Sequence, residues 1–217
     1  MTALERRFDT PHGEARIVVR RARGAVATLL LSHGAGGGID ARDLAALADD
    51  LPRNGVTVVL LEQPWKVAGR KVATPPATLD AGLVAAANRL KTRTPLVVGG
   101  RSAGARSAAR CAKQLGASGC LALAFPLHPP GKPERSRLDE LRGARVPTLV
   151  IQGERDAFGR PEEFPSDLDL SVVPAADHGF KVPARSGLTE ADAMGIIVES
   201  TLEWIVREVA GGGARRE

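Results

Sequence analysis

The sequence predicts an α/β fold in which a mostly parallel sheet carries helices on both faces. Apolar, strand-like runs alternate with amphipathic helical segments along the 217 residues, and this alternation is typical of right-handed strand–helix–strand crossovers. Several runs are apolar throughout rather than at every second position, which indicates strands buried on both faces. The length suits one domain with a sizeable core, so we expect a single domain over residues 1–210 and a flexible tail over 211–217.

The expected strands are apolar, β-prone runs that punctuate the chain. They lie at residues 15–19, 28–31, 56–61, 96–98, 120–125, 148–151 and 168–173. The expected helices are the amphipathic stretches between and after these runs, at residues 41–51, 78–90, 103–115, 138–142 and 190–209. Asp40 and Thr189 are the expected N-caps of the first and last of these helices. The first strand or two precede any helix, so we expect them to pair antiparallel at one edge of the sheet.

Composition and charge exclude several classes of protein. Hydrophobic residues make up 43% of the chain, but no apolar run approaches the ~20 residues of a membrane span. The start has no signal-peptide core, so we expect a cytoplasmic protein without membrane contact. The 30 Lys and Arg against 25 Asp and Glu are scattered, and aromatic residues are 3% of the chain, so nucleic acid is not an expected partner. Cys111 and Cys120 are too few for a zinc site and suit buried packing. No metal or organic cofactor is expected.

A glycine-rich turn supplies the candidate nucleophile. The segment Gly-Arg-Ser-Ala-Gly, residues 100–104, follows an apolar strand and precedes an alanine-rich helix. This context is the one that a nucleophile elbow requires, in which the hydroxyl of Ser102 projects from a tight, strained turn. The alternative is an ordinary strand-to-helix turn in which Ser102 only caps the helix.

Two later strand ends supply a candidate acid and a candidate base. Asp156 follows the run at 148–151, and His178 follows the last expected strand. Ser102 would lose its proton to His178, and Asp156 would orient the imidazole and stabilise its charged form. The chain order Ser, Asp, His is that of α/β-hydrolase triads. Glu154 and Asp177 remain alternatives for the acid.

The glycine-rich segment 32–38 is a candidate oxyanion loop. Its backbone can approach a bound ligand closely, and we assign the oxyanion-hole donors to the N–H groups of Ala35 and Ala103. We expect His33 to brace this loop rather than to take part in chemistry. A dinucleotide-binding fingerprint is the competing interpretation, but Ile39 occupies the position of its third glycine.

Two longer connections, residues 63–76 and 127–137, follow strands and should lie over the carboxyl edge of the sheet, where ligands bind. Trp65 in the first connection and His128 and Lys132 in the second are candidate substrate contacts. His128 is also an alternative catalytic base. The competing interpretation of both connections is a solvated surface loop.

The motifs HGAGGG, GRSAGAR, FPLHPPGKPERS, QGERDAFG and DHGF together resemble a small α/β-hydrolase-like family. This family includes small bacterial hydrolases, and its distant eukaryotic relatives include a testis-expressed protein and a subunit of the non-specific-lethal chromatin complex. Dienelactone hydrolases and short carboxylesterases are similar at a greater distance, although dienelactone hydrolases have cysteine at the position of Ser102. The resemblance covers about residues 15–205.

The resemblance implies an α/β-hydrolase fold without a cap domain and a triad of Ser102, Asp156 and His178. The expected activity is therefore cleavage of a small ester or thioester through an acyl-enzyme. Because some relatives act as partners in complexes, a hydrolase-like interaction module with little turnover is the alternative.

Overall fold

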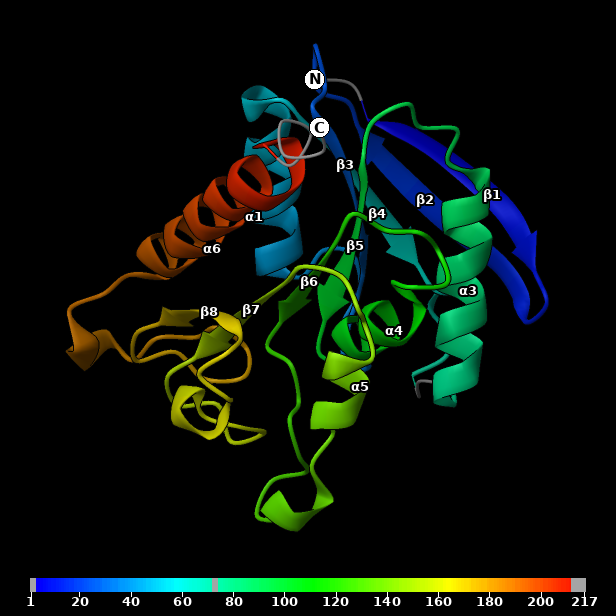
Figure 1. The fold of residues 1–217 in the computed structure, drawn as a ribbon. Coiled ribbons are helices and arrows are strands. Elements are labelled where there is room, and N and C mark those ends of the chain that lie inside the picture. The colour runs from blue at the N-terminus through cyan, green and yellow to red at the C-terminus, as the bar shows by residue number, and fades with distance from the viewer. Residues whose placement is uncertain (1–2, 72–73, 212–217) are drawn as a thin grey trace.

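An eight-stranded sheet forms the centre of the molecule in the computed structural model, which describes residues 3–71 and 74–211 (Figure 1). In chain order the strands are β1 (Leu4–Thr10), β2 (Gly13–Arg20), β3 (Ala27–Ser32), β4 (Val56–Glu62), β5 (Leu96–Arg101), β6 (Gly119–Leu123), β7 (Thr148–Gly153) and β8 (Asp169–Val173). The described helices are α1 (Arg42–Asp50), α2 (Pro64–Val67), α3 (Pro76–Arg89), α4 (Ala103–Cys111), α5 (Leu138–Arg142) and α6 (Glu190–Trp204), which continues as a π-helical segment over Ile205–Ala210.

The strand order is β1-β2-β4-β3-β5-β6-β7-β8, and β3 to β8 are all parallel. β2 pairs antiparallel with both β1 and β4, so the predicted mostly parallel sheet and its antiparallel edge are confirmed. β1 itself was not predicted, because its sequence LERRFDT is charged and largely exposed. It forms because the turn at residues 11–12 pairs it along its whole length with β2.

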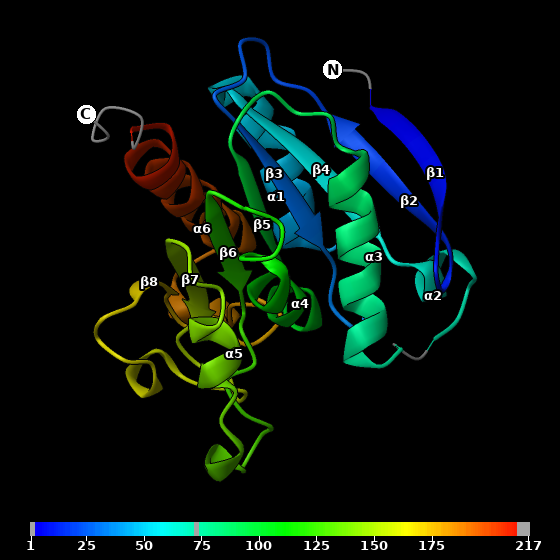
Figure 2. The same ribbon diagram turned by 45° about the vertical axis from the view of Figure 1, so that its right-hand side comes forward.

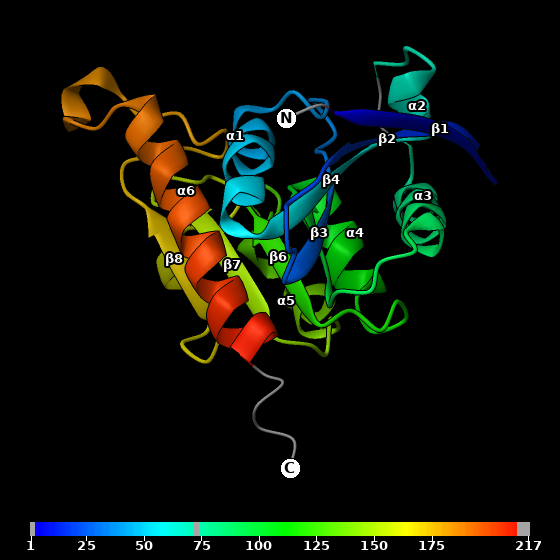
Figure 3. The ribbon, with the colours of Figure 1, turned by 90° about the horizontal axis from the view of Figure 1, so that it is seen from above.

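Helices cover both faces of the sheet, as the sequence predicts (Figures 2 and 3). α1 and α6 pack on one face with Leu29 and Leu31, whereas α3, α4 and α5 pack on the other with Leu30. Successive residues of β3 thus enter opposite apolar cores, and this explains why the strand is apolar throughout. Cys111 and Cys120 are buried in the core on the α3–α4 face, which confirms the expected packing role.

The observed helix starts differ in part from the predicted ones. α1 begins at Arg42 after Ala41, and no side chain caps it, so the predicted Asp40 cap is wrong by one residue. Thr189 does cap α6, because its Oγ1 accepts a hydrogen bond from the N–H of Asp192. The predicted tail over 211–217 lies outside the described residues from 212 onward.

No helix within residues 3–71 and 74–211 is long and apolar enough to cross a membrane. The connection after β6 contains only a short 3-10 turn, Pro133–Arg135, before α5, and the described chain has no inserted cap domain. The expected α/β-hydrolase architecture without a cap is therefore confirmed. The connections after β3, β5, β7 and β8 leave the same edge of the sheet (Figure 2), and they bring the candidate residues together there.

Candidate active site

Ser102 occupies the turn between β5 and α4 in a strained backbone conformation. Its φ is 53° and its ψ is −111°, values that residues with a side chain seldom adopt. The turn is held because the N–H of Ser102 donates to the carbonyl of Leu123 over 2.9 Å. A Cβ at Gly104 would collide with the carbonyl oxygen of Ser32, so only glycine lets β3 approach the start of α4. The hydroxyl makes no capping bond to the helix, which argues against the simple cap.

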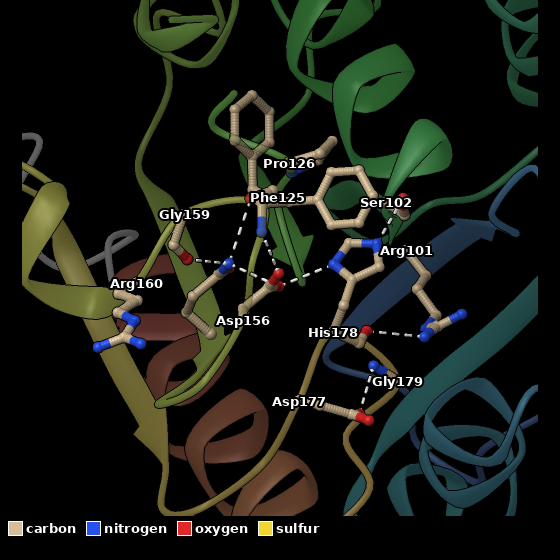
Figure 4. Close-up of polar contacts among 12 residues, drawn as sticks. Arg101, Ser102, Phe125, Pro126, Asp156, Gly159, Arg160, Asp177, His178 and Gly179 are labelled. Atoms are coloured by element: carbon tan, nitrogen blue, oxygen red, sulfur yellow. Dashed lines mark hydrogen bonds and ion pairs between the residues drawn. The ribbon is translucent and has the colours of Figure 1, made fainter. Parts of the chain in front are cut away.

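The hydroxyl of Ser102 instead faces His178, and His178 faces Asp156 (Figure 4). The Ser102 Oγ lies 3.0 Å from His178 Nε2. His178 Nδ1 lies 2.8 Å from Asp156 Oδ2. The three side chains come from the connections after β5, β7 and β8, and they form one continuous line of hydrogen bonds. This is the arrangement in which a base can remove the serine proton while a carboxylate fixes the base.

Asp156 is fully buried, and its carboxylate is surrounded by donors. Besides His178, the Nε2 of Gln152 donates to its Oδ2 over 2.8 Å and the N–H of Phe158 to its Oδ1 over 2.8 Å. A buried carboxylate needs such partners to stay charged. Gln152 was not predicted to have a role, although its position at the end of β7, four residues before the acid, was a usable signal.

The alternative acids point elsewhere. Asp177 Oδ1 accepts the N–H group of Gly179 (Figure 4). It also accepts the N–H group of Lys181 and so closes its own turn. Glu154 accepts the N–H of Ala175. Both carboxylates therefore serve the backbone of the loop that carries His178, and neither contacts its imidazole.

His128, the alternative base, is also engaged elsewhere. Its Nδ1 lies 2.9 Å from the carbonyl oxygen of Pro129, and its Nε2 lies 2.8 Å from Glu163 Oε2. The bond to Pro129 and then the one to Glu163 raise the pKa of His128 against the opposing effect of burial. Both ring nitrogens are occupied, so His128 ties two loops together and does not face Ser102.

The glycine-rich loop after β3 lies directly against the nucleophile. A Cβ at Gly34 would lie 3.4 Å from the Cβ of Ser102. Within the described residues, the N–H groups of Ala35 and Ala103 make no internal hydrogen bond, so both are free to donate to a ligand. His33 is buried and joins the loop to β4, because its Nδ1 faces the Gly34 carbonyl and its Nε2 accepts the N–H of Gln63. Burial lowers the pKa of His33, and a neutral ring suits this bracing position.

The candidate substrate contacts are not brought to Ser102. Trp65 is 3% exposed and packs edge-on against His33, with the ring centroids 5.2 Å apart. Lys132 is exposed on the long connection before α5. No contact in the described part of the chain joins Trp65, His128 or Lys132 to Ser102. Trp65 and His128 contact other residues, and Lys132 faces solvent.

Phe158 and Arg101 complete the surroundings of His178, and neither role was predicted. The ring of Phe158 lies over that of His178, with the ring centroids 4.3 Å apart and an angle of 32° between the ring planes. Arg101 donates from Nη2 to the His178 carbonyl over 2.8 Å (Figure 4).

No group of three or more His, Cys, Asp or Glu side chains that could bind a metal occurs in the described chain. Cavities of about 420, 490 and 730 Å³ lie elsewhere and are not lined by Ser102 or His178.

A mostly parallel sheet with helices on both faces, and a strained serine turn after a central strand, define the α/β-hydrolase class of proteins. The chain belongs to a family described as an alpha/beta hydrolase domain, whose model matches residues 25–206. A comparison with curated proteins finds no match. The resemblance to a testis-expressed protein and a chromatin-complex subunit rests on the sequence motifs alone and stays a prediction.

Solved structures of several hydrolases have the same fold. A serine hydrolase without a lid from Xanthomonas campestris matches with a TM-score of 0.70 and 20% identity over 93% of this chain and 94% of that one. A dienelactone hydrolase from Anabaena variabilis matches with a TM-score of 0.72 and 17% identity over 96% and 98%. An esterase domain from a Rhodothermus marinus protein matches with a TM-score of 0.70 and 14% identity over 95% and 99%. At these identities the likeness concerns the fold.

Proposed function

We propose that the protein is a serine hydrolase that cleaves a small ester or thioester through an acyl-enzyme, and that it works in the cytoplasm. The observation that supports this proposal is the line of hydrogen bonds from Asp156 through His178 to Ser102, which is held at a strained turn. The names of the solved relatives, an esterase domain and a dienelactone hydrolase among them, agree with acyl chemistry.

In the first half of the proposed reaction, Ser102 Oγ attacks the acyl carbon while its proton passes to His178 Nε2. The charge that develops on the acyl oxygen is stabilised by the N–H groups of Ala35 and Ala103. Removing one such donor costs about 3 kcal/mol in hydrolases that use this device. Asp156 stabilises the imidazolium, which then gives its proton to the leaving alcohol or thiol.

In the second half, a water molecule gives a proton to His178 and attacks the acyl-enzyme. The tetrahedral intermediate collapses, the Ser102 oxygen regains its proton from His178, and the acid product leaves. The His178 side chain is 24% exposed and no cap domain is inserted in the described chain, so we expect short acyl and alcohol groups to be accepted without a lid movement.

Labelling with a fluorophosphonate and hydrolysis of p-nitrophenyl acetate test the proposal. The wild-type protein should be labelled at Ser102, and Ser102→Ala should fold but lose labelling and at least about 10⁴-fold in turnover. Ser107→Ala, the same chemical change within the helix that follows Ser102, is the matched control and should keep both. A folded wild-type protein that is neither labelled nor active would instead favour the hydrolase-like interaction module.

A further inference from the structure

The side chain of Arg101 connects three parts of the molecule at the residue next to Ser102. Its Nε lies 3.2 Å from Oδ2 of Asp43, in the first turn of α1. Its Nη2 donates to the backbone carbonyl of His178 over 2.8 Å (Figure 4). We call this pair of side chains the Asp43–Arg101 anchor. It joins the end of β5 and a helix on one face of the sheet to the loop that carries the imidazole.

The two side chains of the anchor are largely buried, so their ion pair is not an incidental contact at the protein surface. Asp43 is 3% exposed, and the side chain of Arg101 is 17% exposed. Burial raises the pKa of the Asp43 carboxyl, and the charge of Arg101 opposes that shift. A buried ion pair contributes little net stability compared with apolar side chains of the same size, so its presence here calls for a role other than stability.

The loop of His178 is otherwise held to itself and to the loop after β7, where the N–H of Arg155 donates to the carbonyl of Ala176 and Glu154 accepts the N–H of Ala175. The N–H of Asp177 donates to the carbonyl of Lys181, and the N–H of Phe180 donates to the carbonyl of Asp177. These bonds set the shape of the turn, but they do not fix its distance from β5. The bond from Arg101 does, because it links the His178 backbone to the residue that precedes Ser102.

We propose that the Asp43–Arg101 anchor holds His178 at hydrogen-bonding distance from Ser102, so that Arg101 and Asp43 are positioning residues for the proposed hydrolysis. This inference rests on the proposed function. Asp43 acts through Arg101 by fixing the direction of its guanidinium. Arginine suits the position because its rigid guanidinium holds the ion pair with Asp43 and the hydrogen bond to the His178 carbonyl at the same time, whereas a lysine ammonium on a flexible stem does both less well.

Kinetics of three variants test the proposal, with p-nitrophenyl acetate as the probe substrate. Arg101→Met removes both contacts and should lower kcat about 10–100-fold, the cost of a small misplacement of a catalytic group, while KM stays within about two-fold. Arg101→Lys should recover part of this loss. Arg101→Met also leaves Asp43 buried without its partner, so the melting temperature should fall.

The double variant Asp43→Asn/Arg101→Met separates positioning from stability. Neutralising residue 43 should restore much of the melting temperature lost in Arg101→Met, but kcat should remain as low as in the single variant, because Asp43 acts only through Arg101. Arg110→Met is the matched control. It breaks the ion pairs of an arginine of similar exposure with Asp80 and Glu140, away from His178, and should lower stability without lowering kcat.

Two results would overturn the inference. One is wild-type kcat in a folded double variant. The other is a loss of kcat that follows the melting temperature across all variants, Arg110→Met included. Either result would leave the proposed function standing as long as Ser102→Ala is inactive. Activity that survives in Ser102→Ala would remove the proposed function itself.

Discussion

Ser102 keeps an unfavourable backbone conformation because its neighbours leave no room for another. β3 passes so close to β5 and to the start of α4 that side chains at Gly100 and Gly104 would both collide with the Ser32 carbonyl. The strain at one residue is therefore maintained by the packing of a strand against a helix. As a consequence, the Ser102 hydroxyl points toward His178 and away from the helix that follows it.

Replacing Gly104 tests this account of the turn. Gly104→Ala should lower the free energy of unfolding by about 1–3 kcal/mol, the usual cost of overpacking, and should slow hydrolysis, because the end of β3 and the start of α4 must move apart. Gly195→Ala on α6 is the control, since a Cβ there meets nothing within 4 Å, and it should leave stability unchanged or slightly higher. Denaturant unfolding measures both, and a neutral Gly104→Ala would contradict the explanation.

Asp156 is the acid that the hydrogen bonds favour, and its conservative variant distinguishes it from its neighbours in sequence. Asp156→Asn should lower kcat by about 10⁴-fold, because the amide cannot hold His178 in the tautomer that accepts the serine proton. Asp177→Asn and Glu154→Gln should have much smaller effects, since those side chains bond only to backbone. A mild Asp156→Asn phenotype together with a severe one at Asp177 would reverse the assignment.

At the scale of elements, the long connection after β6 is joined to the loop after β7. His128 contacts Glu163 of the 3-10 turn Pro161–Glu163, and its backbone N–H donates to the carbonyl of Phe158. Phe158 in turn lies over His178. The connection that follows β6 therefore supports Phe158, which lies over His178, through a backbone hydrogen bond. It does not supply side chains that contact the triad.

The His128 contact predicts a pH-dependent stability. Its pKa is raised in the folded state, chiefly by the bond to Pro129 and then by Glu163. The stabilising contribution is thus fully present below the ordinary imidazole pKa of about 6.5 and is lost as pH rises through the higher value of the folded state. The free energy of unfolding, measured from pH 6 to 9, should decline less in His128→Gln than in the wild-type protein. Parallel curves for the two proteins would exclude this contribution.

At the scale of the whole molecule, one sheet divides two apolar cores. Trp204 lies in the core on the α1–α6 face, and Cys111 and Cys120 lie in the core on the α3–α4 face. Burial raises the pKa of Cys111 to about 11 and that of Cys120 to about 12, so neither thiol is reactive in the folded protein. Because both cores share the same strands, we infer that the described chain behaves as one domain.

Coincident unfolding of the two cores tests that inference. In a Trp65→Phe background, Trp204 fluorescence reports one core and reaction of the thiols with a disulfide reagent reports the other. Both signals should change at the same urea concentration, as two-state unfolding requires. Two separate midpoints would show that the two faces unfold independently and would contradict a single domain.

The sequence by itself determined the central features of the fold. Runs that are apolar at every position required a covered sheet, the alternation of runs and helices required parallel crossovers, and the glycines around Ser102 required a tight turn. These properties are local, since each depends on residue type and spacing within a dozen residues. The edge strand β1 escaped prediction because its charged sequence becomes a strand only by pairing with β2.

Tertiary structure alone decided which side chains meet. The partners of His178 lie 76 and 22 residues away along the chain, and on sequence grounds Glu154 and Asp177 remained alternatives to Asp156 as the acid. Only the packed sheet directs Asp156 to the imidazole, Asp177 and Glu154 to the backbone, and Trp65 into the interior. The Asp43–Arg101 anchor was invisible for the same physical reason: a contact across three elements depends on how they pack, and local sequence does not specify that distance.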